Sequence, residues 1–172
     1  MDCKPWPTRI ILQVLPLGIK INTKAMDKKS VAAAAVTGTT LMTLFSEAVS
    51  NIKGSNYNEA SILGQLLNRI TPLNKKEALL AGWAGHYTVG LAFAAAYAAY
   101  LKKTNSNPTL LNGAVYGALS GLAGAGIWHA TFKAHPNPPG VDLENYYKQL
   151  VLAHVVFGLA AALTLQKTEQ KH

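Results

Sequence analysis

Four long segments of this sequence carry almost no charge, and they restrict the possible fold more than any other feature. Three of them contain no Asp, Glu, Lys or Arg, and the fourth contains only Glu47. A helix needs about 20 apolar residues to span the hydrocarbon core of a bilayer. Each segment is long enough to do so: residues 31–52, 78–101, 104–132 and 149–166.

A water-soluble four-helix bundle is the competing interpretation. Its helices would each place an apolar stripe toward the core and charged residues on the opposite face. The four segments have no charged face, and only 14% of the 172 residues are charged, against about 25% in a typical soluble domain. The sequence therefore predicts an all-α integral membrane protein, an antiparallel up-down bundle of four transmembrane helices.

The expected domain organisation is simple. A single transmembrane domain covers residues 30–166, after a basic segment 1–29 and before a polar tail 167–172. Met26 begins the sequence Met-Asp-Lys-Lys-Ser directly before the first apolar segment, which is typical of a translation start. Residues 1–25 are therefore interpreted as an upstream extension.

Local signals place the helix boundaries. Asn74 and Glu77 have the spacing of a reciprocal N-terminal cap, and Asn107-Pro108 puts proline at the first position of the following helix. The proline-rich run 135–140 cannot continue a helix. The predicted transmembrane helices are residues 30–52, 78–101, 109–132 and 145–166.

A shorter apolar pattern lies between the first two of these helices. This segment, residues 60–70, is too short to span a bilayer. Its apolar side chains share one helical face, so the sequence predicts an amphipathic helix that lies on the bilayer surface. The residues of this face are Ile62, Leu63, Leu66, Leu67 and Ile70.

Small residues indicate where the helices contact each other. Gly113, Gly117 and Gly121 recur at every fourth position of the third predicted helix, and Gly158 lies one turn from His154 in the last. Inside a bilayer, small residues permit two helix backbones to approach closely. We predict that these four glycines pack helices together.

The distribution of Lys and Arg gives an expected orientation. Ten of these residues lie on the side of the two termini and six on the opposite side, a count that becomes six against six if the chain starts at Met26. Cytoplasmic loops carry an excess of Lys and Arg, so both termini are predicted to be cytoplasmic.

The charges flank the helices instead of lining one face, which argues against nucleic acid as a partner. The expected partner is the lipid bilayer, with a homo-oligomer or a larger membrane complex left open.

Ionisable residues inside the predicted helices give the candidate site. With antiparallel connectivity, Glu47, His86, His129 and His154 fall at a similar depth, roughly 6–12 Å inside one boundary at about 1.5 Å per residue. Ionisable groups inside a membrane are costly and usually paired. We therefore predict that these four side chains converge inside the bundle.

Several chemistries fit this predicted cluster. Three imidazoles and a carboxylate match a tetrahedral site for a divalent transition metal, and two of the histidines on facing helices match a b-type haem. A Glu–His group near one surface also suits the handling of protons, ions or a small solute. Hydrogen bonding between helices is the purely structural alternative. The sequence contains no enzyme motif, so no catalytic residue is predicted and a non-enzymatic bundle is expected.

Three short motifs are similar to a known family. Over about residues 26–166, the chain resembles the YagU-like family of small four-helix bacterial inner-membrane proteins. The resemblance implies a location in the bacterial inner membrane and draws attention to His86 and His154, but it implies no particular activity. The motifs are Gly85-His86-Tyr87-Thr88-Val89-Gly90, Trp128-His129 at the end of a glycine-rich helix, and Ala153-His154-Val155-Val156-Phe157-Gly158.

Overall fold

The computed structural model describes residues 27–169, and this part of the chain consists of five α-helices with no strand. The all-helical prediction is therefore confirmed, whereas the predicted extension before Met26 lies outside the described residues. The helices are α1 (Lys28–Lys53), α2 (Glu59–Ile70), α3 (Lys75–Thr104), α4 (Leu110–Ala134) and α5 (Leu143–Glu169).

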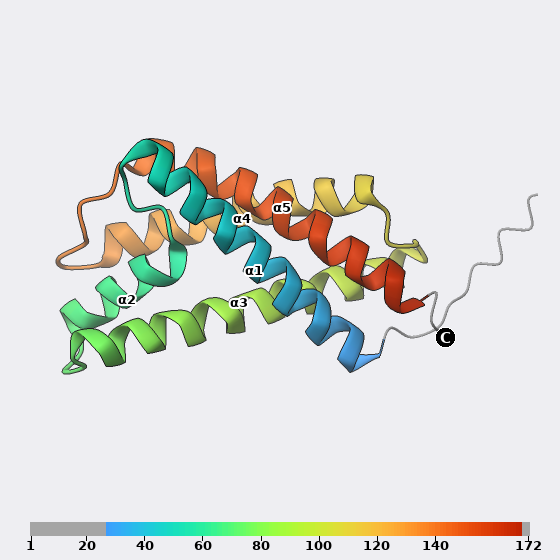
Figure 1. Cartoon of the computed structure of the whole chain (residues 1–172), viewed down its shortest axis with the longest axis horizontal. Helices are drawn as coiled ribbons and strands as arrows, with labels where there is room; N and C mark the ends of the chain where they lie inside the picture. The colour runs from blue at the N-terminus through green and yellow to red at the C-terminus, as the bar shows by residue number, and fades with distance from the viewer. Residues whose placement is uncertain (1–26, 170–172) are drawn as a thin grey trace, which may run out of the picture.

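The four long helices, α1, α3, α4 and α5, alternate in direction, so both ends of the described chain lie at the same end of the bundle (Figure 1). Each of them is long and apolar enough to cross a membrane. Their bounds agree with the predicted ranges to within three residues at every end. The charge-poor segments therefore identify the main elements correctly.

Side-chain caps set the helix starts. Asn74 accepts the N–H of Glu77, and the Glu77 carboxylate accepts the N–H of Asn74, which confirms the predicted reciprocal cap of α3. The start of α4 differs from the prediction. The Thr109 hydroxyl accepts the N–H of Asn112 and caps the helix, so Pro108 precedes α4 instead of occupying its first position.

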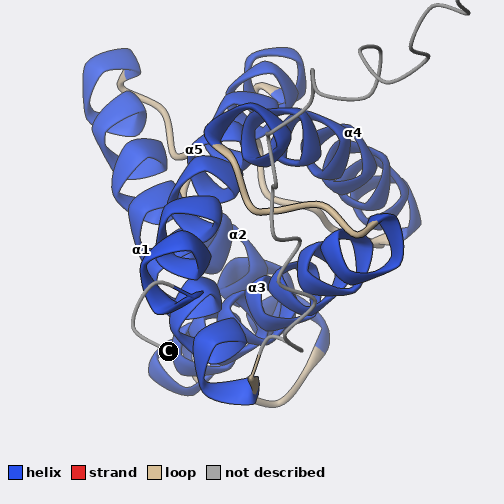
Figure 2. Ribbon diagram, turned by 90° about the vertical axis from the view of Figure 1, so that its right-hand side faces the viewer, coloured by secondary structure: helices blue, strands red, loops and turns tan. Residues whose placement is uncertain are grey.

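The order in which the helices pack differs from their order in the chain. α1 packs against α3 and α5, and α4 packs against α5, whereas α3 and α4 have few close backbone contacts although they are consecutive. Side chains connect these two near their shared turn: Tyr97 donates to Asn112 Oδ1 at 2.5 Å, and Tyr116 donates to the carbonyl of Phe93 at 2.7 Å. Figure 2 views the bundle from this end, with no strand among the described elements. The backbones of α3 and α4 are thus loosely packed against each other.

Glycines permit the closest contact, which is between α4 and α5. A Cβ atom at Gly113 would lie 2.6 Å from the carbonyl oxygen of Gly158, and one at Gly117 would lie 2.7 Å from the Cα of Val155. Gly121 would place its Cβ 2.8 Å from another Cα of α5. All four glycines that we predicted to pack helices therefore lie at this single contact.

The short helix α2 packs one face against α3. Gly82 of α3 leaves no room for a Cβ against the backbone of Ala60 and Gly64 in α2. On the apolar face of α2, Ile62 and Leu66 are buried. The predicted short amphipathic helix is therefore confirmed, with part of its apolar face covered by protein. Its position at the bilayer surface stays a prediction.

The C-terminal end of α2 is bound to the loop between α4 and α5. Arg69 Nη1 donates to the carbonyls of Asn137 and Pro138 at 3.2 and 3.0 Å, and His135 Nε2 donates to the carbonyl of Leu66 at 3.1 Å. α2 lies at the end of the bundle opposite the two chain ends (Figure 1). It therefore closes that end between the long helices.

Candidate functional site

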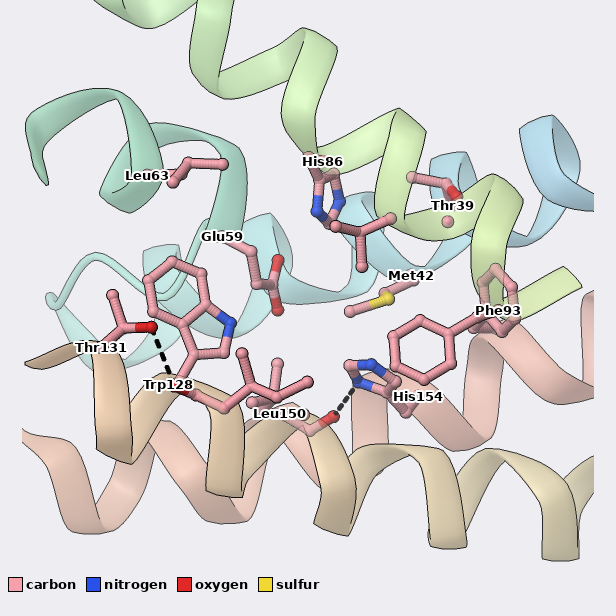
Figure 3. A pocket seen from close by; sticks show the side chains of 15 residues that line it. Thr39, Met42, Glu59, Leu63, His86, Phe93, Trp128, Thr131, Leu150 and His154 are labelled. Carbon is pink, nitrogen blue, oxygen red and sulfur yellow. Dashed lines mark hydrogen bonds between the residues drawn. The ribbon is translucent and has the colours of Figure 1, made fainter. Parts of the chain in front are cut away.

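Two of the four predicted site residues meet at a cavity between the helices. His86 on α3 is 9% exposed and His154 on α5 is 6% exposed. A third ionisable residue, Glu59 at the start of α2, lines the same cavity and is only 2% exposed. Figure 3 shows the three side chains directed toward one space from three different helices.

The cavity has a volume of about 170 Å³ and is lined by residues from all five helices. An apolar cavity of about 150 Å³ holds a benzene-sized molecule, so this one suits a small ring or a short chain. Apart from the three ionisable groups, its walls are mainly apolar. They include Met42 of α1, Leu63 of α2, Phe93 of α3, Trp128 of α4, and Leu150 and Phe157 of α5.

Glu59 is held by a polar network that joins three helices. Ser46 of α1 donates to Glu59 Oε1 at 2.9 Å, and Gln149 Nε2 of α5 donates to Ser46 Oγ at 2.7 Å. No group among the described residues bonds to the second carboxyl oxygen, Oε2, although it is fully buried. One buried acceptor of Glu59 is thus satisfied by protein, and the other is available for a hydrogen bond.

Burial also changes the acidity of Glu59. Desolvation raises the pKa of its carboxyl group from 4.5 to about 7, against smaller lowering effects of hydrogen bonds from its own N–H and from Ser46. In the described part of the chain, no basic side chain forms an ion pair with it. Glu59 can therefore gain and lose a proton near neutral pH.

The hydrogen bonds of His86 identify its protonated nitrogen. The Thr43 hydroxyl donates its only hydrogen to the carbonyl of Thr39 at 2.8 Å, and it lies 2.9 Å from His86 Nε2. The hydroxyl must therefore accept a hydrogen from Nε2. In the neutral ring, the other nitrogen, Nδ1, is then a hydrogen-bond acceptor.

His154 has the opposite arrangement. Its Nδ1 lies 2.9 Å from the carbonyl of Leu150, which can only accept, so Nδ1 carries the hydrogen and Nε2 is the acceptor in the neutral ring. The ring packs edge-on against Phe93, with centroids 5.5 Å apart. On its other side, a Cβ at Gly124 would lie only 3.2 Å from Nε2. The absence of a side chain at Gly124 therefore keeps space beside the free nitrogen.

Two residues of the cavity wall show where the cavity opens. Val89 of α3 and Ile127 of α4 are 50% and 60% exposed, although both line the cavity. They belong to the two long helices that are consecutive but loosely packed. The cavity therefore opens sideways, between α3 and α4.

Glu47 and His129 do not reach the cavity, so the prediction that four side chains converge is wrong. Glu47 is exposed on α1, where it accepts a hydrogen bond from Asn58 Nδ2 at 3.2 Å, and His129 is exposed on α4. A helix turns by about 100° per residue. The residues directly before them, Ser46 and Trp128, are the ones that point inward. The predicted positions are thus one residue out of phase with the interior faces.

The sequence prediction also omits Glu59, because it begins the short helix at Ala60. A signal for Glu59 was nevertheless present. Position 59 precedes Ile62, Leu63 and Leu66 by three, four and seven residues, which places it on their helical face. That face is the buried one, so the same periodicity that identifies the apolar residues also assigns Glu59 to the interior.

The arrangement of these side chains bears on the predicted cofactors. Within residues 27–169, no group of three or more His, Cys, Asp or Glu side chains is placed to hold a metal ion. The predicted metal site is therefore wrong, because Glu47 and His129 lie outside the cavity that contains His86 and His154. A b-type haem does not fit either: a porphyrin is much larger than a cavity of about 170 Å³, and His86 Nε2 is bonded to Thr43.

No protein-family model, curated protein or solved structure matches this chain. The resemblance to the YagU-like family therefore stays a prediction, and the functional argument rests on the cavity and the three ionisable groups that line it.

Proposed function

We propose that the protein is a multi-pass integral membrane protein that binds a small apolar molecule in the cavity between its helices. The observation that carries this proposal is that exposed residues of α3 and α4, Val89 and Ile127, line the cavity. The inferred opening therefore lies between two helices that are both apolar enough to cross a membrane. In a bilayer, this opening would face lipid acyl chains. An apolar ligand dissolved in the bilayer would then enter the cavity without crossing water.

The outer surface of the helices supports the membrane location. Large apolar side chains are exposed along all four long helices, and Leu111 is 76% exposed. Soluble monomers rarely expose contiguous apolar patches of more than a few hundred Å². In a bilayer, the same side chains would contact lipid. Further examples are Leu44, Leu80, Leu119, Leu122 and Leu152.

We assign the protein to the bacterial inner membrane with both termini in the cytoplasm. The resemblance to the YagU-like family supports the compartment. The ten-to-six distribution of Lys and Arg, counted from Met1, supports the orientation. An accessory subunit of a larger membrane complex is the alternative role. Purification in mild detergent distinguishes the two, because a subunit co-purifies with its partner proteins, whereas a ligand-binding protein retains binding when purified alone.

Filling the cavity from α4 tests the proposed function. In Gly124→Leu, the new side chain would occupy the space beside His154, so we expect binding of a small apolar probe to be lost. Para-fluorotoluene is a suitable probe, and fluorine NMR of protein-loaded and empty nanodiscs measures its binding.

Gly126→Leu is the matched control. It places the same side chain two residues further along α4, where a Cβ meets no atom within 4 Å, and it should bind the probe like the wild type. If Gly124→Leu folds and still binds with unchanged affinity, the cavity is not the binding site and the proposal is wrong.

Proton exchange by Glu59 is a second candidate function, favoured by a pKa of about 7 in a fully buried carboxyl group. A protonated carboxyl group has a C=O stretch distinct from the carboxylate bands. Infrared difference spectra of the reconstituted protein should therefore show this stretch disappearing as the pH rises through about 7. Glu59→Gln should lack the signal, whereas Glu47→Gln, at an exposed position, should retain it. A signal that persists in Glu59→Gln would assign the proton to another group.

A further inference from the structure

The polar groups of the cavity indicate that its ligand carries a polar group in addition to an apolar part. Three ionisable side chains face one space from α2, α3 and α5 (Figure 3). Their hydrogen bonds to protein leave one polar atom of each unused: Glu59 Oε2, His86 Nδ1 and His154 Nε2. The unused atoms differ in the hydrogen bonds that they can form, and this difference constrains the ligand.

The two imidazole nitrogens are both acceptors. Thr43 takes up the N–H of His86, and the carbonyl of Leu150 takes up the N–H of His154. A ligand that bonds to either free nitrogen must therefore supply a hydrogen. A ligand whose only polar atom is a carbonyl or ether oxygen cannot do so.

Glu59 supplies the complementary group. Ser46 donates to Oε1, so the proton of the neutral carboxyl group resides on Oε2, the buried oxygen that lacks a partner within the described residues. A protonated carboxyl oxygen donates one hydrogen bond. The three ionisable groups thus present one donor and two acceptors inside a mainly apolar wall. The Thr39 hydroxyl, which is buried and lacks a partner within the described residues, is a further polar group of this wall.

We propose, on the basis of the proposed function, that the natural ligand is an apolar molecule with a hydroxyl group, either an alcohol or a phenol. A hydroxyl group combines one donor hydrogen with acceptor lone pairs. It donates to His154 Nε2, beside the space left by Gly124, and it accepts from Glu59 Oε2. The apolar part of the ligand contacts Phe93, Leu150 and Trp128 and extends toward the opening between α3 and α4.

A ligand series on one ring tests this assignment. Para-fluorophenol, para-fluorotoluene and para-fluorobenzylamine differ in the group opposite fluorine: a hydroxyl, a methyl and an aminomethyl group that is cationic at neutral pH. Their dissociation constants are measured by fluorine NMR with the full chain in nanodiscs at pH 6. Each constant is calculated from the concentration of the probe in the lipid phase. We expect para-fluorophenol to bind about tenfold more tightly than para-fluorotoluene, as one or two buried hydrogen bonds provide.

A variant locates the hydroxyl contact. His154→Phe keeps a ring of similar size but removes Nε2, so the ratio of its affinities for para-fluorophenol and para-fluorotoluene should fall to about one. His129→Phe, which makes the same change on the exposed face of α4, should keep the preference.

The possible results separate this inference from the proposed function. Equal binding of the phenol and the toluene overturns the hydroxyl assignment but leaves an apolar binding protein. Tightest binding of the benzylamine also overturns it and indicates an ammonium site at ionised Glu59. Absence of binding by all three probes overturns the proposed function itself.

Discussion

Replacing Gly117 by alanine is expected to break the contact between α4 and α5. The added Cβ would lie 2.7 Å from the Cα of Val155 and even nearer to the carbonyl oxygen of His154. Both obstacles are backbone atoms, which cannot rotate away as a side chain can. The two helices must therefore separate, and overpacking of this kind costs about 1–3 kcal/mol or more. The free energy of unfolding in mixed micelles measures the loss.

Gly126→Ala is the control, and its expected effect has the opposite sign. A Cβ at Gly126 meets no atom within 4 Å, and alanine favours a helix over glycine by about 1 kcal/mol. The same methyl group on the same helix should thus destabilise at one position and leave stability unchanged or increased at the other. Equal effects of the two substitutions would contradict the close α4–α5 contact.

The second large effect concerns the pH dependence of stability. The folded protein holds the proton of Glu59 with a pKa of about 7, against 4.5 for the group in an unfolded chain. The stabilisation from this proton is fully present below pH 4.5 and is lost as the pH rises through about 7. The free energy of unfolding attributable to Glu59 should fall by about 3 kcal/mol across this interval, at about 1.4 kcal/mol per pKa unit.

Glu59→Gln isolates this contribution. Glutamine keeps a carbonyl oxygen that accepts from Ser46 but does not titrate, so the variant should lack the decrease and should be more stable than the wild type above pH 7. Unfolding titrations of both proteins in the same micelles between pH 4 and 8 measure the difference curve. Parallel curves would show that Glu59 exchanges its proton equally in the folded and unfolded states.

The sequence predicts the long elements well because the relevant signals are one-dimensional. A charge-free run of sufficient length marks a long apolar helix wherever it packs, and the reciprocal cap at Asn74 and Glu77 depends only on residues three positions apart. The glycines at every fourth position likewise define a face without reference to the partner helix. These features required no knowledge of the tertiary structure.

The candidate site depends on rotation about each helix axis, which the sequence constrains less. The sequence predicts that Glu47 turns inward, yet the neighbouring Ser46 is the residue that does so and bonds to Glu59. His86 and His154 were identifiable because glycines one turn away mark their faces as interior. His129 follows Trp128 on a helix with glycines on more than one side, so its direction was ambiguous.

The order of the helix contacts has a consequence for synthesis. α3 packs against both α1 and α2, whereas α5 packs against α1 and α4. A ribosome releases the first three helices before the last two, so α3 can associate with α1 and α2 while α4 and α5 are still being made. Gln149 lies on α5 and donates to Ser46 on α1. The network that holds Glu59 is therefore complete only after the final helix has joined the others.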